Sequence, residues 1–313
     1  MAGYHELPKA ELHLHLEGSA TPELMRTLAP ESTPDEIKAR FAFQTFAGFL
    51  ECYKWVAQHL TSPADYALLT RHLLAELERQ NVRYAEVTLS AGVVLRLAKQ
   101  EFAPIYDAVQ REAERSPVTI RWNLDAVRQF GADQAMQVAR LAAERINDGV
   151  VSFGIGGDEE RGPAEWFTEV YAFARSSGLR LTAHAGETTG PDSIWGALHL
   201  GAERIGHGIR AVQDPDLMRH LRDQNIPLEI CISSNVATGA VESLAAHPVR
   251  RLYDSGVPII LNTDDPGMFR TTLEREYELA AREFGFSDAE LKGIVENGFR
   301  YAFAPAENVS GQT

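Results

Sequence analysis

Two histidines near the start of the chain have the types and spacing of a metal-binding pair. The segment Glu11-Leu-His-Leu-His-Leu-Glu17 alternates polar and apolar residues, as a β-strand does. Because alternate residues of a strand point to the same face, His13 and His15 would lie side by side with leucines packed behind them. Two imidazoles one pleat apart can bind one metal ion. Taken alone, the pair could also be structural histidines held by hydrogen bonds.

Further histidines and carboxylates follow three other apolar runs. These runs end in Thr182-Ala-His184-Ala-Gly-Glu187, in Ile205-Gly-His207-Gly, and in Leu261-Asn-Thr-Asp264-Asp265-Pro. Such residues at the ends of four expected strands are hard to explain as packing, and they predict a metal site at one end of a sheet. The adjacent carboxylates of Asp264 and Asp265 would be costly to bury without a nearby cation.

The elements that must position these residues alternate along the chain. Several of the short runs are nearly all apolar, which is typical of strands covered on both faces. Stretches with helical spacing lie between them, including residues 63–80, 132–147, 164–176 and 214–224, and Ser287-Asp-Ala-Glu290 is a capping box that begins a helix. The expected strands are Ala10–Leu16, Arg83–Leu89, Val118–Val127, Val150–Gly156, Leu179–Ala185, Arg204–Gly208, Pro227–Cys231 and Pro258–Thr263.

Eight strands that alternate with helices predict an α/β fold, a closed (β/α)8 barrel of the TIM type. An open, doubly wound sheet is the alternative. The segment Thr21–His59 fits no strand–helix repeat, so we expect a helical insertion after the first strand. The 313 residues are a normal size for one barrel, and we expect residues 1–313 to form a single domain.

Composition narrows the classes of partner and compartment. The net charge of −14 argues against nucleic acid, which needs clustered Lys and Arg. No run has the apolar length of a membrane span, and the N-terminus lacks the basic start and apolar core of a signal peptide. Only two cysteines occur, Cys52 and Cys231, so we expect no disulfide framework and a cytoplasmic protein.

Together the motifs resemble those of the adenosine deaminase family of the amidohydrolase superfamily. The resemblance rests on His13-Leu-His-Leu-Glu17-Gly, His184-Ala-Gly-Glu187, Gly206-His-Gly208 and Asn262-Thr-Asp-Asp-Pro266, in the family's order, and runs from about Leu7 to Phe303. It implies a metal-dependent hydrolase that removes the 6-amino group of a purine nucleoside and releases ammonia. The implied ligands of one Zn²⁺ ion per chain, with an acidified water molecule at the remaining position, are His13, His15, His184 and Asp264.

The resemblance also implies roles around the substrate. His207 would take or orient the proton of the water molecule, and a protonated Glu187 would donate to N1 of the purine. Asp265 would hydrogen-bond to N7 or to the attacking hydroxyl, and the backbone amide of Gly157 would bind N3. Attack at C6 places negative charge on the ring nitrogens, so a neutral carboxylic acid suits this chemistry, and a dry pocket can raise its pKa.

Departures from the family pattern bear on the substrate. Glu17, which we expect to bind the substrate, stands where adenosine deaminases usually have an Asp that contacts the ribose 5′ hydroxyl. The segment 86–91 lacks the family's Arg and Pro, and the segment 154–158 has smaller or uncharged residues. The segments 234–240 and 247–248 look like the nucleoside-using branch. This pattern favours a nucleoside altered at its 5′ end, and 6-aminodeoxyfutalosine of menaquinone biosynthesis fits best, with adenosine or deoxyadenosine as the alternative and adenine as a further one. Candidate contacts to the 5′ extension are Arg128, Arg161 and Arg210.

Other classes of protein fit less well. Two-metal relatives of this barrel carry a bridging Lys at the end of the fourth strand, where this chain has Gly156-Gly-Asp158. A non-catalytic nucleoside-binding protein predicts a lost ligand or a lost Glu187. The zinc deaminases that act on nucleic-acid bases use Cys-x-x-Cys, which is absent. The sequence leaves two points open: the oligomeric state, and whether Phe43, Phe46 and Phe49 form a lid over the substrate or ordinary core.

Overall fold

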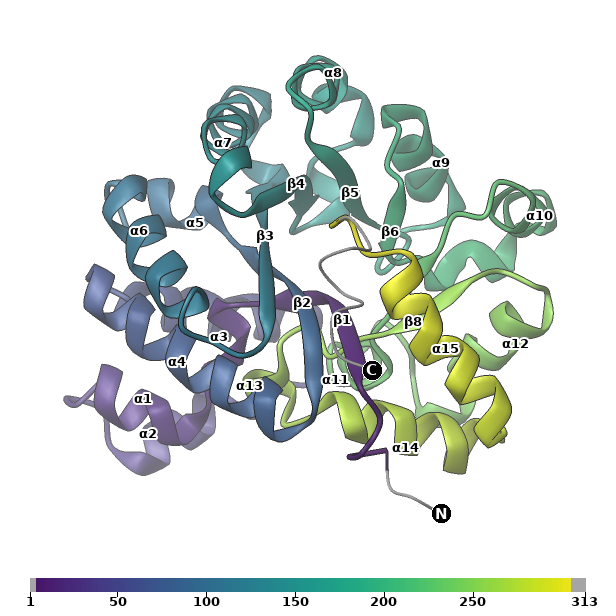
Figure 1. Cartoon of the computed structure of the whole chain (residues 1–313), viewed down its shortest axis with the longest axis horizontal. Coiled ribbons are helices and arrows are strands. Elements are labelled where there is room, and N and C mark those ends of the chain that lie inside the picture. Colours follow the sequence, from purple (N-terminus) through teal and green to yellow (C-terminus); the bar gives the residue numbers. More distant parts are fainter. Residues whose placement is uncertain (1–3, 305–313) are drawn as a thin grey trace.

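The computed structural model of the chain describes residues 4–304. Eight parallel strands, hydrogen-bonded in the order β1 to β8, stand at its centre, and helices surround them (Figure 1). The strands are β1 Lys9–His15, β2 Val82–Leu89, β3 Thr119–Val127, β4 Val150–Gly156, β5 Arg180–Ala185, β6 Arg204–His207, β7 Leu228–Ile230 and β8 Ile259–Leu261. The first and last residues of each strand lie within two positions of those predicted from the sequence. That residues 1–313 form one domain stays a prediction, since residues 1–3 and 305–313 lie outside the described residues.

The sheet closes between its first and last strands. Leu14 and Asp264 form a parallel bridge, in which the backbone nitrogen of His15 donates to the Asp264 carbonyl at 2.8 Å and that of Asp264 donates to the His13 carbonyl at 3.1 Å. The (β/α)8 barrel is therefore confirmed. The alternative of an open doubly wound sheet is wrong, because such a sheet reverses its strand order and leaves two free edges.

The predicted helical insertion after β1 is present as α1 Pro22–Leu28, α2 Pro34–Arg40 and α3 Phe46–His59. Each of these helices begins after a threonine that accepts a hydrogen bond from a backbone amide of the first turn. The remaining α-helices are α4 Pro63–Arg79, α5 Ala91–Arg96, α6 Phe102–Ala113, α7 Ala132–Glu144, α8 Thr168–Ser176, α9 Pro191–Leu200, α10 Pro215–Asp223, α11 Ile232–Ala237, α12 Val249–Asp254, α13 Pro266–Phe269, α14 Leu273–Phe284 and α15 Asp288–Arg300. The predicted capping box of Ser287 and Glu290 begins α15. No helix in the described range is long and apolar enough to cross a membrane.

Apolar side chains fill the layer between strands and helices, whereas the barrel interior holds a buried charged cluster. Arg204 Nε donates to Glu229 Oε1 at 2.6 Å, and Arg204 Nη2 donates to Glu86 Oε2 at 2.5 Å. Arg204 Nη1 donates to the Tyr301 carbonyl at 2.9 Å, which ties the segment after α15 to the barrel interior. An unpaired buried charge is costly, so loss of Arg204 would leave the charges of Glu86 and Glu229 without this partner and destabilise the fold.

Candidate active site

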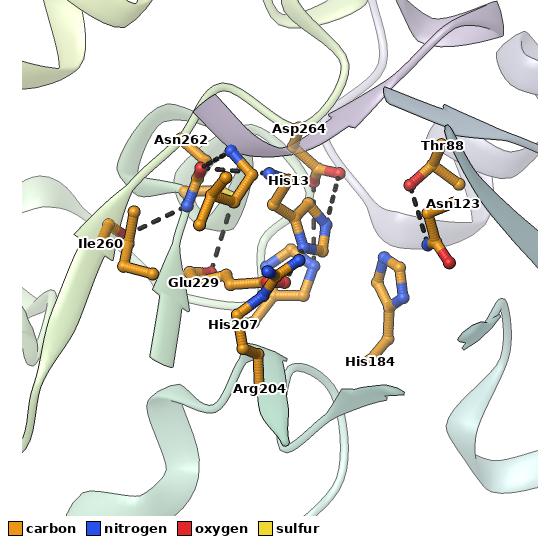
Figure 2. Close-up of polar contacts among 12 residues, drawn as sticks. His13, Thr88, Asn123, His184, Arg204, His207, Glu229, Ile260, Asn262 and Asp264 are labelled. Carbon is orange, nitrogen blue, oxygen red and sulfur yellow. Dashed lines mark hydrogen bonds and ion pairs between the residues drawn. The ribbon is translucent and has the colours of Figure 1, made fainter. Parts of the chain in front are cut away.

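The predicted metal-binding and catalytic residues lie at the carboxyl ends of their strands, where the active sites of (β/α)8 barrels are found. His13 and His15 come from β1, His184 from β5 and His207 from the end of β6. Asp264 lies three residues beyond β8. Figure 2 shows His13, His184, His207 and Asp264 grouped around one point between the strands.

Three histidines and one aspartate present metal-binding atoms to that point. Nε2 of His15 lies 3.2 Å from Nε2 of His184, and Oδ1 of Asp264 lies 3.3 Å from Nε2 of His13 and 3.4 Å from Nε2 of His15. One ligand atom from each of the four residues lies within 4.8 Å of the others. The buried Nε2 of His13 has no hydrogen-bond partner among the described residues. This convergence of nitrogen lone pairs and a carboxylate fits a single zinc ion.

The opposite ring nitrogens hold two of these histidines in a metal-binding tautomer. Nδ1 of His13 donates to Glu229 Oε2 at 2.7 Å, and Nδ1 of His184 donates to the Ile155 carbonyl at 3.1 Å. With the proton on Nδ1, Nε2 keeps its lone pair for the metal. Neither Glu229 nor Ile155 belongs to the motifs that predicted the site.

Hydrogen bonds from neighbouring residues and an unusual backbone conformation determine the orientation of the Asp264 carboxylate. Ser234 Oγ donates to Asp264 Oδ2 at 2.6 Å, which leaves Oδ1 toward the histidines. The carbonyl oxygen of the Asn262 side chain accepts from the backbone nitrogens of Leu12 and His13 at 2.8 and 3.1 Å, so the Asp264 segment is fastened to β1. Asp264 itself has φ +66°, a costly conformation for a residue with a side chain that is common at functional sites.

A second group of potential ligands in the described part of the chain, His207, Cys231 and Asp264, shares Asp264 with the first. Burial raises the pKa of the Cys231 thiol well above its usual range. The thiol donates to the Glu229 carbonyl at 3.7 Å. The set of His13, His15, His184 and Asp264 offers four ligand atoms instead of three, as a zinc-type site requires, and it includes the unpartnered Nε2 of His13.

A chain of hydrogen bonds determines which nitrogen of His207 carries the proton. The backbone nitrogen of Val249 donates to His247 Nδ1 at 3.2 Å, so His247 Nε2 carries a hydrogen and donates to Asn235 Oδ1 at 3.1 Å. The Asn235 amide nitrogen then donates to His207 Nδ1 at 3.1 Å. Burial lowers the pKa of His207 to about 4, so its ring is neutral. His207 therefore presents Nε2–H toward Glu187 and Asp264, whose carboxylates lie 3.7 and 3.8 Å away.

Glu187 and Asp265 are carboxyls of the cavity lining whose surroundings favour the protonated state. Burial raises the pKa of each well above its usual range, and the Asp264 carboxylate raises both further. Asp265 Oδ1 is buried and has no hydrogen-bond partner within the described residues. A Cβ on Gly18 would overlap the Asp265 carboxyl, so this position needs glycine. A buried, protonated carboxyl is the form needed for proton donation.

A cavity of about 330 Å³ leads from the metal ligands to the surface. Gly157, with φ +91°, forms part of its wall, together with Glu187, His207 and Asp265. Phe46 and Phe49 of α3 line it too. Phe43 instead packs against the rings of Phe49 and Phe269. Phe46 and Phe49 thus belong to the cavity wall, and Phe43 belongs to the packing behind it.

Glu17 lies behind the cavity wall. It is fully buried; its Oε1 accepts from the backbone nitrogen of Ser90 and its Oε2 from the hydroxyl of Tyr53, both at 3.1 Å. Ser90 and Tyr53 line the cavity, whereas Glu17 is not among the lining residues. A direct contact between Glu17 and the substrate stays a prediction.

The three arginines predicted as contacts for the 5′ extension lie in different surroundings. Arg161 lines the cavity. Arg128 is buried, and its guanidinium donates to the carbonyls of Gly162 and His184. Arg210 donates to the Ala240 carbonyl. A second cation in the lining, Lys54, was not predicted.

Sequence reasoning also missed Asp125, whose buried carboxyl lines the cavity. Its Oδ1 has no hydrogen-bond partner in the described range, and burial raises its pKa to about 8. Asp125 lies near the end of β3, and this position could have predicted it, because the other site carboxylates also lie near strand ends.

A closed parallel barrel with three histidines and one aspartate around a metal position at its carboxyl end defines a metal-dependent hydrolase of the amidohydrolase type. A family model described as adenosine deaminase matches residues 8–311, and the chain belongs to the adenosine deaminase family. It is a purine aminohydrolase with a zinc-type metal site.

Individual relatives agree with this family. An aminodeoxyfutalosine deaminase of Streptomyces avermitilis is 41% identical, over 96% of this chain and 87% of the relative. An adenine deaminase of Rhizobium leguminosarum bv. trifolii is 38% identical, over 96% of each chain. The solved structure of an amidohydrolase from Burkhoderia ambifaria with bound Zn has a TM-score of 0.90 at 26% identity, and covers 98% of this chain and 88% of its own.

Proposed function

We propose that this protein hydrolyses 6-aminodeoxyfutalosine to futalosine and ammonia. The observation that carries the proposal is a cavity with metal ligands at its buried end and two cations, Arg161 and Lys54, among its exposed lining residues. Its volume of about 330 Å³ is at the low end of the range for drug-sized ligands and exceeds what a bare purine base fills. The identity to an aminodeoxyfutalosine deaminase over nearly the whole chain supports the same substrate.

The 5′ extension of this substrate is an aromatic carboxylate, and the cavity offers both kinds of contact. Leu50, Leu97 and Phe130 supply an apolar wall for the ring. Arg161 and Lys54 supply positive charge for the carboxylate, although Lys54 also lies 3.9 Å from the carboxylate of Glu51. Guanidinium groups bind carboxylates through paired hydrogen bonds, so Arg161 is the stronger candidate.

The reaction at C6 would use the buried end of the cavity. His13, His15, His184 and Asp264 would hold a zinc ion, which would lower the pKa of a water molecule toward neutrality. His207 would orient the attacking oxygen by donating from Nε2–H, which differs from the expected role of taking or orienting the proton of the water molecule. Glu187 would give its proton to N1 of the purine, which makes C6 more electrophilic.

Two further contacts would hold the purine ring during attack. Asp265, whose protonated carboxyl can donate, would hydrogen-bond to N7 or to the attacking hydroxyl. The Gly157 amide would donate to N3. The amino group would then leave as ammonia with one proton of the water molecule, the other proton would return to Glu187, and the water oxygen would stay at C6 as a carbonyl.

The test is kcat/KM of the zinc-loaded protein for 6-aminodeoxyfutalosine, adenosine and adenine. We expect the first to be the best substrate, and an equal or higher value for adenosine or adenine would overturn the choice. Adenine is the second candidate, because an adenine deaminase is nearly as similar to this chain.

The substitution Arg161→Gln should lower kcat/KM for 6-aminodeoxyfutalosine about tenfold, the value of one charge-assisted hydrogen bond, and leave adenosine unchanged. Arg251→Gln, an exposed arginine on α12 outside the cavity lining, is the matched control.

A further inference from the structure

The carboxylate of Glu159 accepts hydrogen bonds from three consecutive backbone amides of the loop that carries Glu187. Glu159 begins the short 3-10 helix η4 (Glu159–Arg161) after β4 and is 7% exposed. Its Oε2 accepts from the nitrogen of Gly186 at 2.7 Å. Its Oε1 accepts from the nitrogens of Glu187 and Thr188, both at 2.9 Å. The backbone of Glu187 is thus fixed directly to Glu159.

Hydroxyl groups complete the set of donors. Oε2 of Glu159 also accepts from Thr189 Oγ1 at 2.8 Å and from Ser193 Oγ at 2.5 Å, and Oε1 accepts from Thr188 Oγ1 at 3.4 Å. After burial, the largest effects on the pKa of this carboxyl come from hydrogen-bond donors, which stabilise its negative charge. Hydrogen bonds to an ionised acceptor are stronger than neutral ones, so the carboxylate and the loop hold each other.

The loop depends on this anion because of its backbone shape. Gly186 has φ +69°, and a Cβ at this position would overlap Ile194. The turn aims the amides of Gly186, Glu187 and Thr188 to one side, an arrangement that elsewhere binds phosphate and other anions. Without an acceptor these buried donors would be unsatisfied, and the loop would move to find others.

We propose that Glu159 is a positioning residue for the proton donor, because it holds the 186–189 loop in the conformation that points the Glu187 carboxyl into the cavity. This inference rests on the role of Glu187 in the proposed function. Gly157, in the wall that faces the purine, lies two residues before Glu159. The same β4–η4 segment therefore forms the wall of the base pocket and holds the group that protonates the base.

A purely structural role makes a different prediction from a positioning role. If Glu159 only stabilised the fold, its loss would lower the yield or the melting temperature, and the folded, zinc-loaded molecules would turn over normally. If it positions Glu187, the folded molecules themselves would be slow. A displacement of about 1 Å in a reacting group can cost about 10²-fold in rate.

The first measurement is the kinetics of Glu159→Gln at full zinc occupancy. Glutamine keeps the shape but replaces one acceptor oxygen with a donating NH₂ group, which cannot accept from the loop amides. We expect kcat to fall about 10²-fold while KM and zinc content stay close to wild type, the pattern of a contact that matters only in the transition state. The control is Glu160→Gln, an exposed neighbour on the same helix, which should match wild type.

The second measurement is a double-mutant cycle with Glu187→Gln. If Glu159 acts through Glu187, the double variant should have the kcat of Glu187→Gln alone. A normal kcat for Glu159→Gln, or losses that multiply in the double variant, would overturn the positioning role and leave the proposed function intact. Full activity of Glu187→Gln would instead overturn the proposed function.

A milder variant covers the case in which Glu159→Gln does not fold. Ser193→Ala removes one hydroxyl donor from Oε2 and leaves the carboxylate in place. We expect kcat to fall about fivefold at unchanged zinc content, the effect of one hydrogen bond. An unchanged kcat would contradict the inference.

Discussion

The side-chain amide of Asn235 donates to Nδ1 of His207 at 3.1 Å, and this contact places the His207 proton on Nε2. The Asn235 amide cannot be reversed, because its oxygen accepts from His247, whose other nitrogen already accepts from the backbone of Val249. His207 also has φ +60°, so the chain adopts a costly backbone conformation to present this ring. A fixed tautomer of this kind is expected where the His207 ring must donate a hydrogen bond to a reacting oxygen.

Replacement of Asn235 by Asp tests this tautomer. An ionised Asp accepts from His207 Nδ1–H and moves the neutral ring to the opposite tautomer, or charges it. We expect a loss in kcat of at least about 10²-fold with unchanged zinc content, since a wrong histidine tautomer is known to be costly in catalysis. Asn147→Asp, an exposed substitution of the same kind, should have no effect. An active Asn235→Asp enzyme would show that His207 does not need Nε2–H.

Glu229 should control zinc affinity through His13. Its Oε2 accepts from His13 Nδ1, and its Oε1 accepts from Arg204, so the carboxylate is held in place from the other side. The substitution Glu229→Gln should weaken zinc binding about 10- to 100-fold, the usual effect of losing such a partner. Competition with a chelator of known affinity measures it. Glu203→Gln, at a half-buried glutamate paired with Arg180, is the control, and equal zinc affinity in Glu229→Gln would contradict this role of Glu229.

Glu159 should make the folded state sensitive to acid. Burial alone would raise the pKa of its carboxyl, but hydrogen bonds from Ser193, Thr188, Thr189 and Gly186 outweigh burial and lower the pKa from 4.5 to about 2. A depressed carboxyl pKa contributes stability above pH 4.5 that is lost as the pH falls through about 2, and the shift corresponds to about 3 kcal/mol. Denaturant unfolding between pH 7 and pH 2 should show a steeper loss for wild type than for Glu159→Gln. Parallel curves would refute this stabilisation.

The strand positions were predictable because the first strand alternates polar and apolar residues and several others are short, nearly apolar runs. The last strand is shorter than predicted, Ile259–Leu261 instead of Pro258–Thr263. The reason is that Asn262 and Thr263 contact β1: the Asn262 side chain accepts from β1 backbone amides, and the Thr263 nitrogen donates to Glu11 Oε1. The predicted helix 164–176 is instead a 3-10 turn, Ala164–Phe167, followed by α8.

The metal ligands were predictable from motifs, whereas the residues that orient them were not. Glu229 lies 216 residues from His13, and Asn235 lies 28 residues from His207. The local sequence around such a polar residue has no pattern that identifies a distant partner, since the fold of the barrel determines which residues meet. Glu159 is 28 residues from Glu187 and shares this difficulty. Glu17 belongs to a motif that predicted a substrate contact, which stays a prediction, and its carboxylate accepts hydrogen bonds from Tyr53 and Ser90.

We propose that a protonated Glu187 acts beside a zinc site of three histidines and one aspartate to deaminate a 6-aminopurine. The most direct test is the rate of ammonia release from 6-aminodeoxyfutalosine by wild type and by Glu187→Gln, each at one zinc ion per chain. Glutamine keeps the size of the side chain but cannot transfer a proton, so we predict stoichiometric ammonia from wild type and a rate about 10²- to 10⁴-fold lower from the variant. Equal rates at equal zinc content would contradict the account.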